Sequence, residues 1–363
     1  MARWLSMKGV LSYSCSSIFA TLVAVAIIAP VTPQMAAAES QDPVSFSGYL
    51  DAIVDHDFNN LPSRKRPYTT QPYYNDEAAL NLGYADVTLE TDRYRGRLAV
   101  QYGSSVIANY SDERHQFWRY IQEGYGGIQI SDSWRIDAGI FFSHIGMESW
   151  ISRDDYTVGR SLISDYSPYY QTGVRSIHDI SGRLRIEVLI LRGWQNISDQ
   201  QDPSLGTQVA YKFSPSTKVT HNTFVGNISG TRVYNDFVLS QEITSRFGLD
   251  AAFDVGFQNQ TSDSHAWWYG WSIIPHYKVD DTVALAGRVE QFSDPHHVVL
   301  QSLSDQSFNA VSLSTNIDIT LAKDLIWRSE YRAYLSSRDL FPNNDGFSST
   351  DNVVSSSLIY TLR

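Results

Sequence analysis

Residues 134–143 read WRIDAGIFFS, and their side chains alternate in character with a period of two. One set of positions is apolar throughout: Trp134, Ile136, Ala138, Ile140 and Phe142. The intervening set is mostly polar or small: Arg135, Asp137, Gly139, Phe141 and Ser143. Successive side chains of a β-strand point to opposite faces, so this pattern predicts a strand with one apolar and one polar face.

The same alternation recurs along the rest of the chain after residue 40. Residues 247–257, for example, place Phe, Leu, Ala or Val at every second position and mostly Gly or Asp between them. About sixteen such segments can be counted, at residues 44–58, 78–92, 94–106, 119–131, 133–143, 169–178, 183–195, 205–213, 217–227, 231–243, 246–259, 266–279, 282–293, 307–320, 324–336 and 351–363. No segment of comparable length has a helical period, which predicts an all-β chain.

The connections between these segments alternate in length. Those after the even-numbered segments are tight, as in Thr91-Asp92-Arg93, whereas those after odd-numbered segments are mostly long. Only Asn227 to Gly230 departs from this rule. Short turns on one side and long loops on the other are typical of outer-membrane barrels. The sequence therefore predicts a transmembrane antiparallel up-and-down β-barrel of about sixteen strands, with periplasmic turns and external loops.

Composition excludes several other classes of protein. The chain of 363 residues carries a net charge of −11, which argues against the basic surface of a nucleic-acid binder. Its single Cys excludes a disulfide framework and a Cys-based zinc site. No stretch after residue 40 approaches the ~20 apolar residues of a spanning helix, so any membrane must be crossed by strands.

A soluble β-sandwich or β-solenoid is the alternative to a membrane barrel. Aromatic spacing favours the barrel, because Trp134 and Phe142 lie eight residues apart on one apolar face, as do Tyr94 and Tyr102. Eight tilted strand residues cover roughly 20 Å, close to the ~25 Å apolar band between the aromatic girdles of such barrels.

Residues 1–38 are expected to be a signal peptide and residues 39–363 the barrel. Arg3 and Lys8 precede an apolar core, and Ala36 to Ala38 supply small residues for cleavage. A membrane-anchoring helix is the alternative interpretation, but the apolar core is short for it. The expected location is the outer membrane of a Gram-negative cell.

The third long connection, residues 144–168, is expected to fold inward and narrow the pore, as the third external loop does in sixteen-stranded general porins. It carries the carboxylates Glu148, Asp154, Asp155 and Asp165. Strand positions in the inward phase carry Arg95, Arg97, Arg135, Arg183, Arg185, Arg328 and Arg332. Opposite charges across a narrow lumen create a transverse field, so these residues form the predicted pore constriction. The alternative left open is that the arginines are solvated lumen residues paired with Glu187, Glu290 and Glu330.

Several stretches resemble one known family. They are residues 48–51 (GYLD), 95–101 (RGRLAVQ), 137–149 (DAGIFFSHIGMES), 168–170 (PYY) with Gly173, and 193–196 (GWQN). These resemble the putative β-barrel porin 2, or OmpL-like, family. The resemblance covers nearly the whole chain after the leader and implies an outer-membrane porin.

The expected function is a water-filled channel for passive diffusion of small hydrophilic solutes and ions. A structural or adhesive surface barrel and an outer-membrane lipase are the alternatives, although no Gly-x-Ser-x-Gly motif is present. No catalytic, cofactor or metal site is predicted. Expected partners are outer-membrane lipid and lipopolysaccharide, small solutes and the barrel-insertion machinery, with no nucleic acid; the choice between monomer and homo-oligomer stays open.

Overall fold

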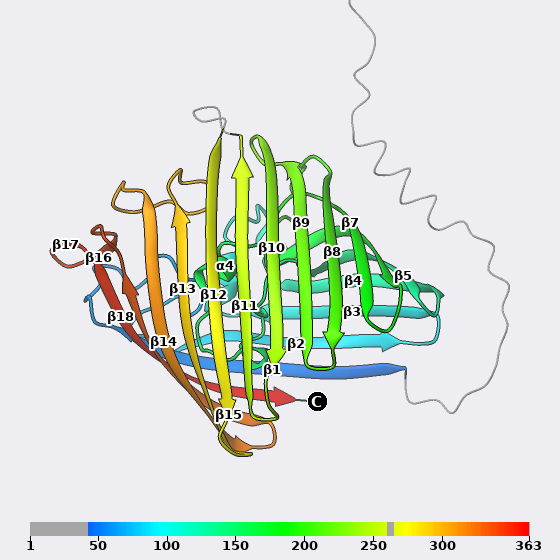
Figure 1. The fold of residues 1–363 in the computed structure, drawn as a ribbon, viewed down its shortest axis with the longest axis horizontal. Helices are drawn as coiled ribbons and strands as arrows, with labels where there is room; N and C mark the ends of the chain where they lie inside the picture. Colours follow the sequence, from blue (N-terminus) through cyan, green and yellow to red (C-terminus); the bar gives the residue numbers. More distant parts are fainter. Residues whose placement is uncertain (1–42, 260–264, 363) are drawn as a thin grey trace, which may run out of the picture. The chain divides into compact units, whose positions relative to one another are not determined.

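The computed structural model describes residues 43–259 and 265–362, and the leader predicted at residues 1–38 lies outside these ranges. In the described part, sixteen strands form one closed antiparallel barrel (Figure 1). Strands consecutive in the chain are neighbours in the barrel, which closes where the first strand pairs with the last. The predicted all-β, up-and-down barrel of sixteen strands is confirmed.

The barrel strands are β1 Val44–Asp57, β2 Ala79–Glu90, β3 Tyr94–Tyr102, β4 Ile121–Ser131, β5 Trp134–Phe142, β6 Tyr170–Asp179, β7 Leu184–Leu191, β8 Ser204–Ser214, β9 Thr217–Asn227, β10 Thr231–Glu242, β11 Phe247–Gln258, β12 Ala266–Lys278, β13 Val283–Asp294, β14 Phe308–Ala322, β15 Leu325–Leu335 and β18 Thr350–Leu362. A separate hairpin of β16 Phe341–Asn343 and β17 Gly346–Ser348 lies before β18. The helices are short: α2 Ser104–Asn109, α3 Gln116–Arg119 and α4 Leu162–Asp165, with a 3₁₀ turn η1 at Ser152–Asp154. Within the described residues, none of the helices has the length and apolar character needed to span a membrane.

The two ends of the barrel differ as the sequence predicts. Tight turns follow the even-numbered strands β2 to β14, and both ends of the barrel chain lie on this side, since Gly48 pairs with Leu362. We call this side the inner end and the opposite side the outer end. The long loops of the outer end include L2 (residues 103–120), L3 (143–169), L4 (192–203) and L7 (295–307).

Two predicted strands end earlier than expected: the segment 183–195 ends as β7 at Leu191, and the segment 94–106 ends as β3 at Tyr102. The segment 94–106 was expected to be extended throughout, but β3 ends at Tyr102 and α2 follows. Gly103 has φ 152°, and a Cβ at this position would overlap the Asn81 carbonyl oxygen on the neighbouring strand. Only glycine fits this turn, which ends the strand and directs L2 inward.

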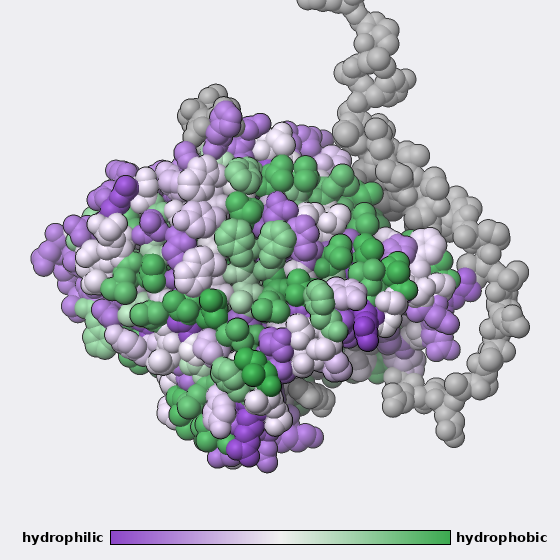
Figure 2. All heavy atoms as spheres, in the orientation of Figure 1, coloured by the Kyte–Doolittle hydropathy of each residue, from purple (hydrophilic) through white to green (hydrophobic). Residues whose placement is uncertain are grey.

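The strands alternate between a polar lumen face and an apolar outer face. In β14, Ser312, Ser314 and Asn316 are buried, whereas Val311 and Leu313 are exposed on the outside. On the side seen in Figure 2, apolar side chains cover much of the strand surface, and hydrophilic ones gather towards the loops at the left. Tyr94, Tyr102, Trp134 and Phe257 are among the exposed outer aromatics, which suits contact with lipid and its interfaces.

Candidate functional site

L3 begins at β5 and crosses the lumen to reach β13 and β15. Three buried arginines of these strands bind its backbone carbonyls. Arg288 donates to Gly159 O at 2.7 Å, and Arg332 donates to Arg160 O at 2.9 Å. Arg328 donates to Asp155 O at 2.7 Å. These charge-assisted hydrogen bonds tie the middle of L3 to the wall opposite its origin.

The same wall also binds backbone N–H groups of L3. Glu330 accepts from Gly159 N, and Glu290 accepts from Leu162 N, each at 2.7 Å. Both carboxylates also pair with arginines, since Glu330 lies 2.8 Å from Arg288 and Glu290 contacts Arg332. The buried charges are therefore paired and hydrogen-bonded, as burial requires.

Glu148 links two parts of L3 to each other and also joins the loop to the barrel wall. Its carboxylate accepts from Ser161 N at 2.8 Å and from the Ser161 hydroxyl, and lies 3.3 Å from Arg288 Nη1. Its side chain is 4% exposed. The predicted constriction residue Glu148 thus contacts β13 directly and does not face it across open water.

The three aspartates of L3 have different surroundings. Asp155 is buried and accepts from Ser149 N at 2.7 Å, and its burial raises its pKa well above the usual range, reinforced by the charge of Glu148. Asp165 is buried and accepts from Thr70 Oγ1 at 2.6 Å; burial likewise raises its pKa. Asp154 is exposed. Only Asp154 of the three aspartates therefore presents its side chain mainly to solvent.

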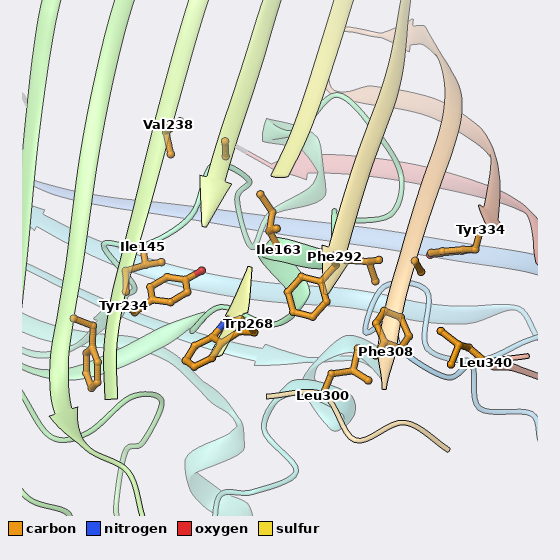
Figure 3. Packing of buried hydrophobic residues seen from close by; sticks show 14 of the residues in the cluster. Ile145, Ile163, Tyr234, Val238, Trp268, Phe292, Leu300, Phe308, Tyr334 and Leu340 are labelled. Atoms are coloured by element: carbon orange, nitrogen blue, oxygen red, sulfur yellow. The ribbon is translucent and has the colours of Figure 1, made fainter. Parts of the chain in front are cut away.

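Apolar contacts complete the docking of L3. Figure 3 shows Ile163 of α4 near Phe292 of β13, and the same cluster includes Tyr234 and Trp268. Gly270 of β12 makes room for this contact, because a Cβ there would lie 2.5 Å from Ile163 Cγ2. The close approach of loop and strand explains why glycine occupies this strand position.

The first turn of L3 is fixed by His144. Its Nε2 lies 2.9 Å from Thr223 O, and because a carbonyl only accepts, Nε2 carries the proton. The backbone carbonyl of His144 accepts from Gln208 Nε2 at 2.9 Å. Burial lowers the pKa of the His144 ring. Gly206 packs against this ring so closely that a Cβ on residue 206 would lie 2.8 Å from His144 Nε2.

The other predicted arginines lie on a different part of the wall. Arg95 and Arg175 both bind Asp137, and Arg97 binds Asp86 and Glu123. Arg135 and Arg185 share Asp179, at 3.3 and 2.7 Å. Among the described residues, every ion pair of these arginines is with a strand carboxylate.

The structure therefore divides the predicted constriction into two groups. Arg328 and Arg332 meet L3, together with Glu148, Asp155 and Asp165 in the loop. Arg95, Arg97, Arg135 and Arg185 form a ladder of ion pairs on β2 to β7, while Arg183 is exposed at the inner end. Glu290 and Glu330, suggested as partners in the solvated-lumen alternative, do pair with arginines, namely Arg332 and Arg288, but these arginines are buried and also hold L3.

L3 lies between cavities at the two ends of the lumen. The outer cavity, of about 520 Å³, is lined by Asp165 to Ser167 and Tyr169 of L3 and by parts of L2, L4 and L7. Two cavities lie at the inner end. One, of about 400 Å³, includes Gly146 and Met147 of L3; the other, of about 350 Å³, includes Tyr156 of L3, whose ring stacks on His276 at 3.8 Å.

The two inner cavities carry opposite charge. The one beside β6 to β10, the basic inner cavity, is lined by Arg183, Arg185, Lys212 and Lys218 and one acid, Asp179. The one beside β10 to β15, the acidic inner cavity, is lined by Glu242, Asp280, Asp281 and Asp318, with Arg246 and Lys278.

Lys212 and Lys218 were absent from the predicted site. They are directly opposite each other across β8 and β9, and neither forms an ion pair within the described ranges. The alternation of residues 204–214 could have revealed them, because Lys212 shares the phase of Gln208 and Ala210, which also line the lumen. No group of three His, Cys, Asp or Glu residues suited to a metal ion occurs in the part of the chain that the structure describes.

The family model described as "Putative beta-barrel porin-2, OmpL-like" matches residues 43–362, which is nearly all of the barrel. The chain belongs to this family. It is an outer-membrane porin, and the resemblance noted from the sequence is confirmed.

Solved structures show the same fold for this porin. The outer membrane channel DcaP of Acinetobacter baumannii matches with a TM-score of 0.60 at 12% identity, over 90% of this chain and 100% of that one. OmpF of Salmonella typhi, solved with daunomycin, has a TM-score of 0.56 at 12% identity, over 88% and 97%. An anion-selective porin from Comamonas acidovorans has a TM-score of 0.58 at 8% identity, over 88% and 99%. A comparison with curated protein sequences gives no match.

Proposed function

We propose that this porin passes small hydrophilic solutes by diffusion, that L3 forms its narrowest part, and that anions and cations follow different sides of the inner lumen. The observation that carries the proposal is the position of L3. It crosses from β5 to β13 and β15, with cavities on both sides of it. A solute that moves between these cavities must pass the edge of L3.

The charges that act on a solute are those that are not already paired where L3 binds the wall. Glu148, Arg288, Arg328 and Arg332 bind one another or the loop backbone and are nearly buried. Exposed charge remains at Asp154, at Lys212 and Lys218, and at Glu242. A basic and an acidic wall that face a common lumen create a transverse field, which acts on ions without any chemical step.

The proposal places this field at the inner end of the lumen. The sequence-based hypothesis had instead opposed the acids of L3 to the arginine wall. Most of the arginines and acids in that hypothesis form ion pairs at contact distance. The opposite charges of such a pair largely cancel, so the pair exerts little electric field on an ion elsewhere in the lumen. Lys212 and Lys218, which form no ion pair among the described residues, and the exposed Glu242 act over a longer range, up to the Debye length of roughly 8 Å at physiological ionic strength.

The test is ion selectivity in planar lipid bilayers. The double variant Lys212→Gln, Lys218→Gln should shift the reversal potential in a KCl gradient towards cations, and Glu242→Gln should shift it towards anions. Lys323→Gln in the exposed turn between β14 and β15 is the matched control and should change nothing. Shifts in the same direction for the lysine and Glu242 variants would overturn the proposed separation, and the absence of discrete conductance steps in the native protein would overturn the channel itself.

We also propose how the protein reaches the outer membrane and consider its oligomeric state in that membrane. Cleavage after Ala38 would release a chain that begins four residues before the family match at residue 43. Insertion would involve the barrel-insertion machinery and place the outer surface against lipid and lipopolysaccharide. OmpT of Vibrio cholerae, which matches with a TM-score of 0.57 at 11% identity, was solved in a trimer form. Crosslinking in intact membranes tests whether this porin also forms a homo-oligomer.

A further inference from the structure

The outer cavity contains a buried cation that the passage of ions does not explain. Arg232, near the outer end of β10, lines this cavity and is 5% exposed. Its Nε donates to Gln258 Oε1 at 2.6 Å, and no carboxylate within the described ranges forms an ion pair with it. Asp294 acts on the guanidinium only from beyond ion-pair distance. A buried guanidinium without a directly paired counter-ion is costly, so its charge must be offset further.

Aromatic rings supply part of that offset. The Arg232 guanidinium carbon lies 4.9 Å from the centre of the Trp194 ring and 5.3 Å from that of Trp268. These distances are those of cation–π contacts, which stabilise a desolvated cation but satisfy none of its N–H donors. The planar guanidinium is thereby held in one orientation, with its fork still able to bind a carboxylate.

Two of the acids that border the cavity, Glu113 and Asp165, already accept hydrogen bonds. Glu113 accepts from the Tyr170 hydroxyl and from Ile197 N, each at 2.8 Å. Asp165 accepts from Thr70 and from the Tyr169 hydroxyl at 2.7 Å. Neutral donors therefore satisfy these two carboxylates, neither of which pairs with Arg232, and the guanidinium can bind an anion from outside.

The lining next to Arg232 indicates the rest of such a ligand. Trp194, Ile228, Val298 and Val299 give this part of the cavity an apolar wall. Asp112 and Asp199 also line the cavity and would repel a second negative charge on the ligand. A single carboxylate attached to a flat apolar ring fits both features, because the ring can pack on Trp194 while the carboxylate meets Arg232.

We propose that the outer cavity is a binding site for small aromatic monocarboxylates, with Arg232 as the anion-binding residue and Trp194 as the stacking residue. The site lies on the outer side of L3, above the edge that solutes must pass. It is independent of the two inner cavities, so the failure of either proposal leaves the other standing.

Isothermal titration calorimetry of the folded porin in detergent tests the site, with benzoate as the probe. Native porin should bind benzoate saturably, while benzamide, which has the same shape without the charge, should bind at least tenfold more weakly. Arg232→Gln should weaken benzoate binding at least tenfold, and Arg232→Lys should weaken it less, because the charge remains without the fork. Arg338→Gln, an exposed arginine before β16, is the matched control and should retain native affinity.

Two results would overturn the site. Equal binding of benzoate and benzamide by the native porin removes the role of the charge without any variant. Native benzoate affinity in Arg232→Gln, with folding verified by the gel shift of the unheated barrel, removes the role of Arg232. If Arg232→Gln fails to fold, the Arg232→Lys variant and the benzamide comparison decide the question. Native benzoate affinity in Arg232→Lys together with equal binding of benzamide would contradict the proposal.

Discussion

Glu148 of L3 and Arg288 of β13 lie 140 residues apart in the chain, yet Oε1 of the first is 3.3 Å from Nη1 of the second. Both side chains are almost completely buried, and each also binds L3: Glu148 at Ser161, Arg288 at Gly159. This pair therefore joins the loop to the wall and also fixes the shape of the loop.

Breaking the pair should release L3. Glu148→Gln leaves the Arg288 charge without one of its partners. Removing one member of a buried ion pair lowers the free energy of unfolding by up to about 3–5 kcal/mol. We expect a rise in single-channel conductance or in current noise and a lower unfolding temperature. A double-mutant cycle with Arg288→Gln should give a coupling of about 0.5–3 kcal/mol in unfolding free energy. Additive effects would show that the two side chains act separately.

The space beside His144 gives a steric test of the same docking. Gly206→Ala places a methyl group 2.7 Å from His144 Cε1, so the ring must move and lose its bond to Thr223. Overpacking of this kind destabilises by about 1–3 kcal/mol. Gly126→Ala is the control, because a Cβ there meets nothing within 4 Å. Thermal unfolding should separate the two variants, and equal unfolding temperatures would contradict the close packing of His144.

The docking of L3 should also depend on pH through Asp165. Burial raises the pKa of this carboxyl in the docked loop, despite the charges of Arg160 and Arg332 and hydrogen bonds from Thr70 and Tyr169. A released loop would return it to its usual pKa of about 4. The raised pKa means that docking is strongest when Asp165 is protonated and weakens as pH rises from about 4 through the docked pKa.

Conductance measured across this range should therefore increase with pH in the native porin. Asp165→Asn keeps a neutral side chain at every pH and should flatten that part of the profile. Asp345→Asn, at an exposed position between β16 and β17, should leave the profile unchanged. A profile that survives in Asp165→Asn would assign the pH dependence to other groups.

Asp154 should influence ions, whereas Glu148 and Asp155 should influence the position of the loop. Asp154→Asn should shift the reversal potential towards anions at 0.01 M salt, where the Debye length is roughly 30 Å, and hardly at all at 1 M, where it is roughly 3 Å. Asp155→Asn should mainly change conductance. A selectivity shift of the same size at both salt concentrations would contradict a purely electrostatic role for Asp154.

Orientation can be tested with single cysteines, since the chain after residue 38 contains none. Cys at Asp202 in L4 should react with a membrane-impermeant maleimide on intact cells. Cys at Asp281 in the turn between β12 and β13 should react only after the outer membrane is opened. Both positions are exposed, so access to reagent is the only difference. Equal labelling on intact cells would contradict the assignment of long loops to the outside.

The strands could be predicted from the sequence because each carries its own signal. Alternation in β14 or β5 is local, and the short turns between strands fix where each begins and ends. The helix after Gly103 was missed for a different reason. It depends on a backbone conformation that is imposed by Asn81 on the neighbouring strand, and no local pattern encodes such a contact.

The site was less accessible to the same reasoning. Period-two phase predicted that Arg328 and Arg332 face the lumen, and charge composition identified L3 as acidic. Phase places a side chain on a face but gives neither its height along the barrel nor its partner. Asp154 and Asp155 are therefore equivalent in the sequence, although one is exposed and the other is enclosed by the loop and Arg328.

The distance in sequence between L3 and its anchors bears on the order in which the molecule assembles. L3 meets Glu290 at a sequence separation of 128 residues and Arg328 at a separation of 173. A growing barrel that has formed only β1 to β12 contains the loop but none of the arginines that bind it. The loop can reach its final place only after the last strands join, and such long-range closure is slow. Until then the middle of L3 lacks its anchors on β13 and β15, and the narrow form of the channel is the last feature of the protein to be completed.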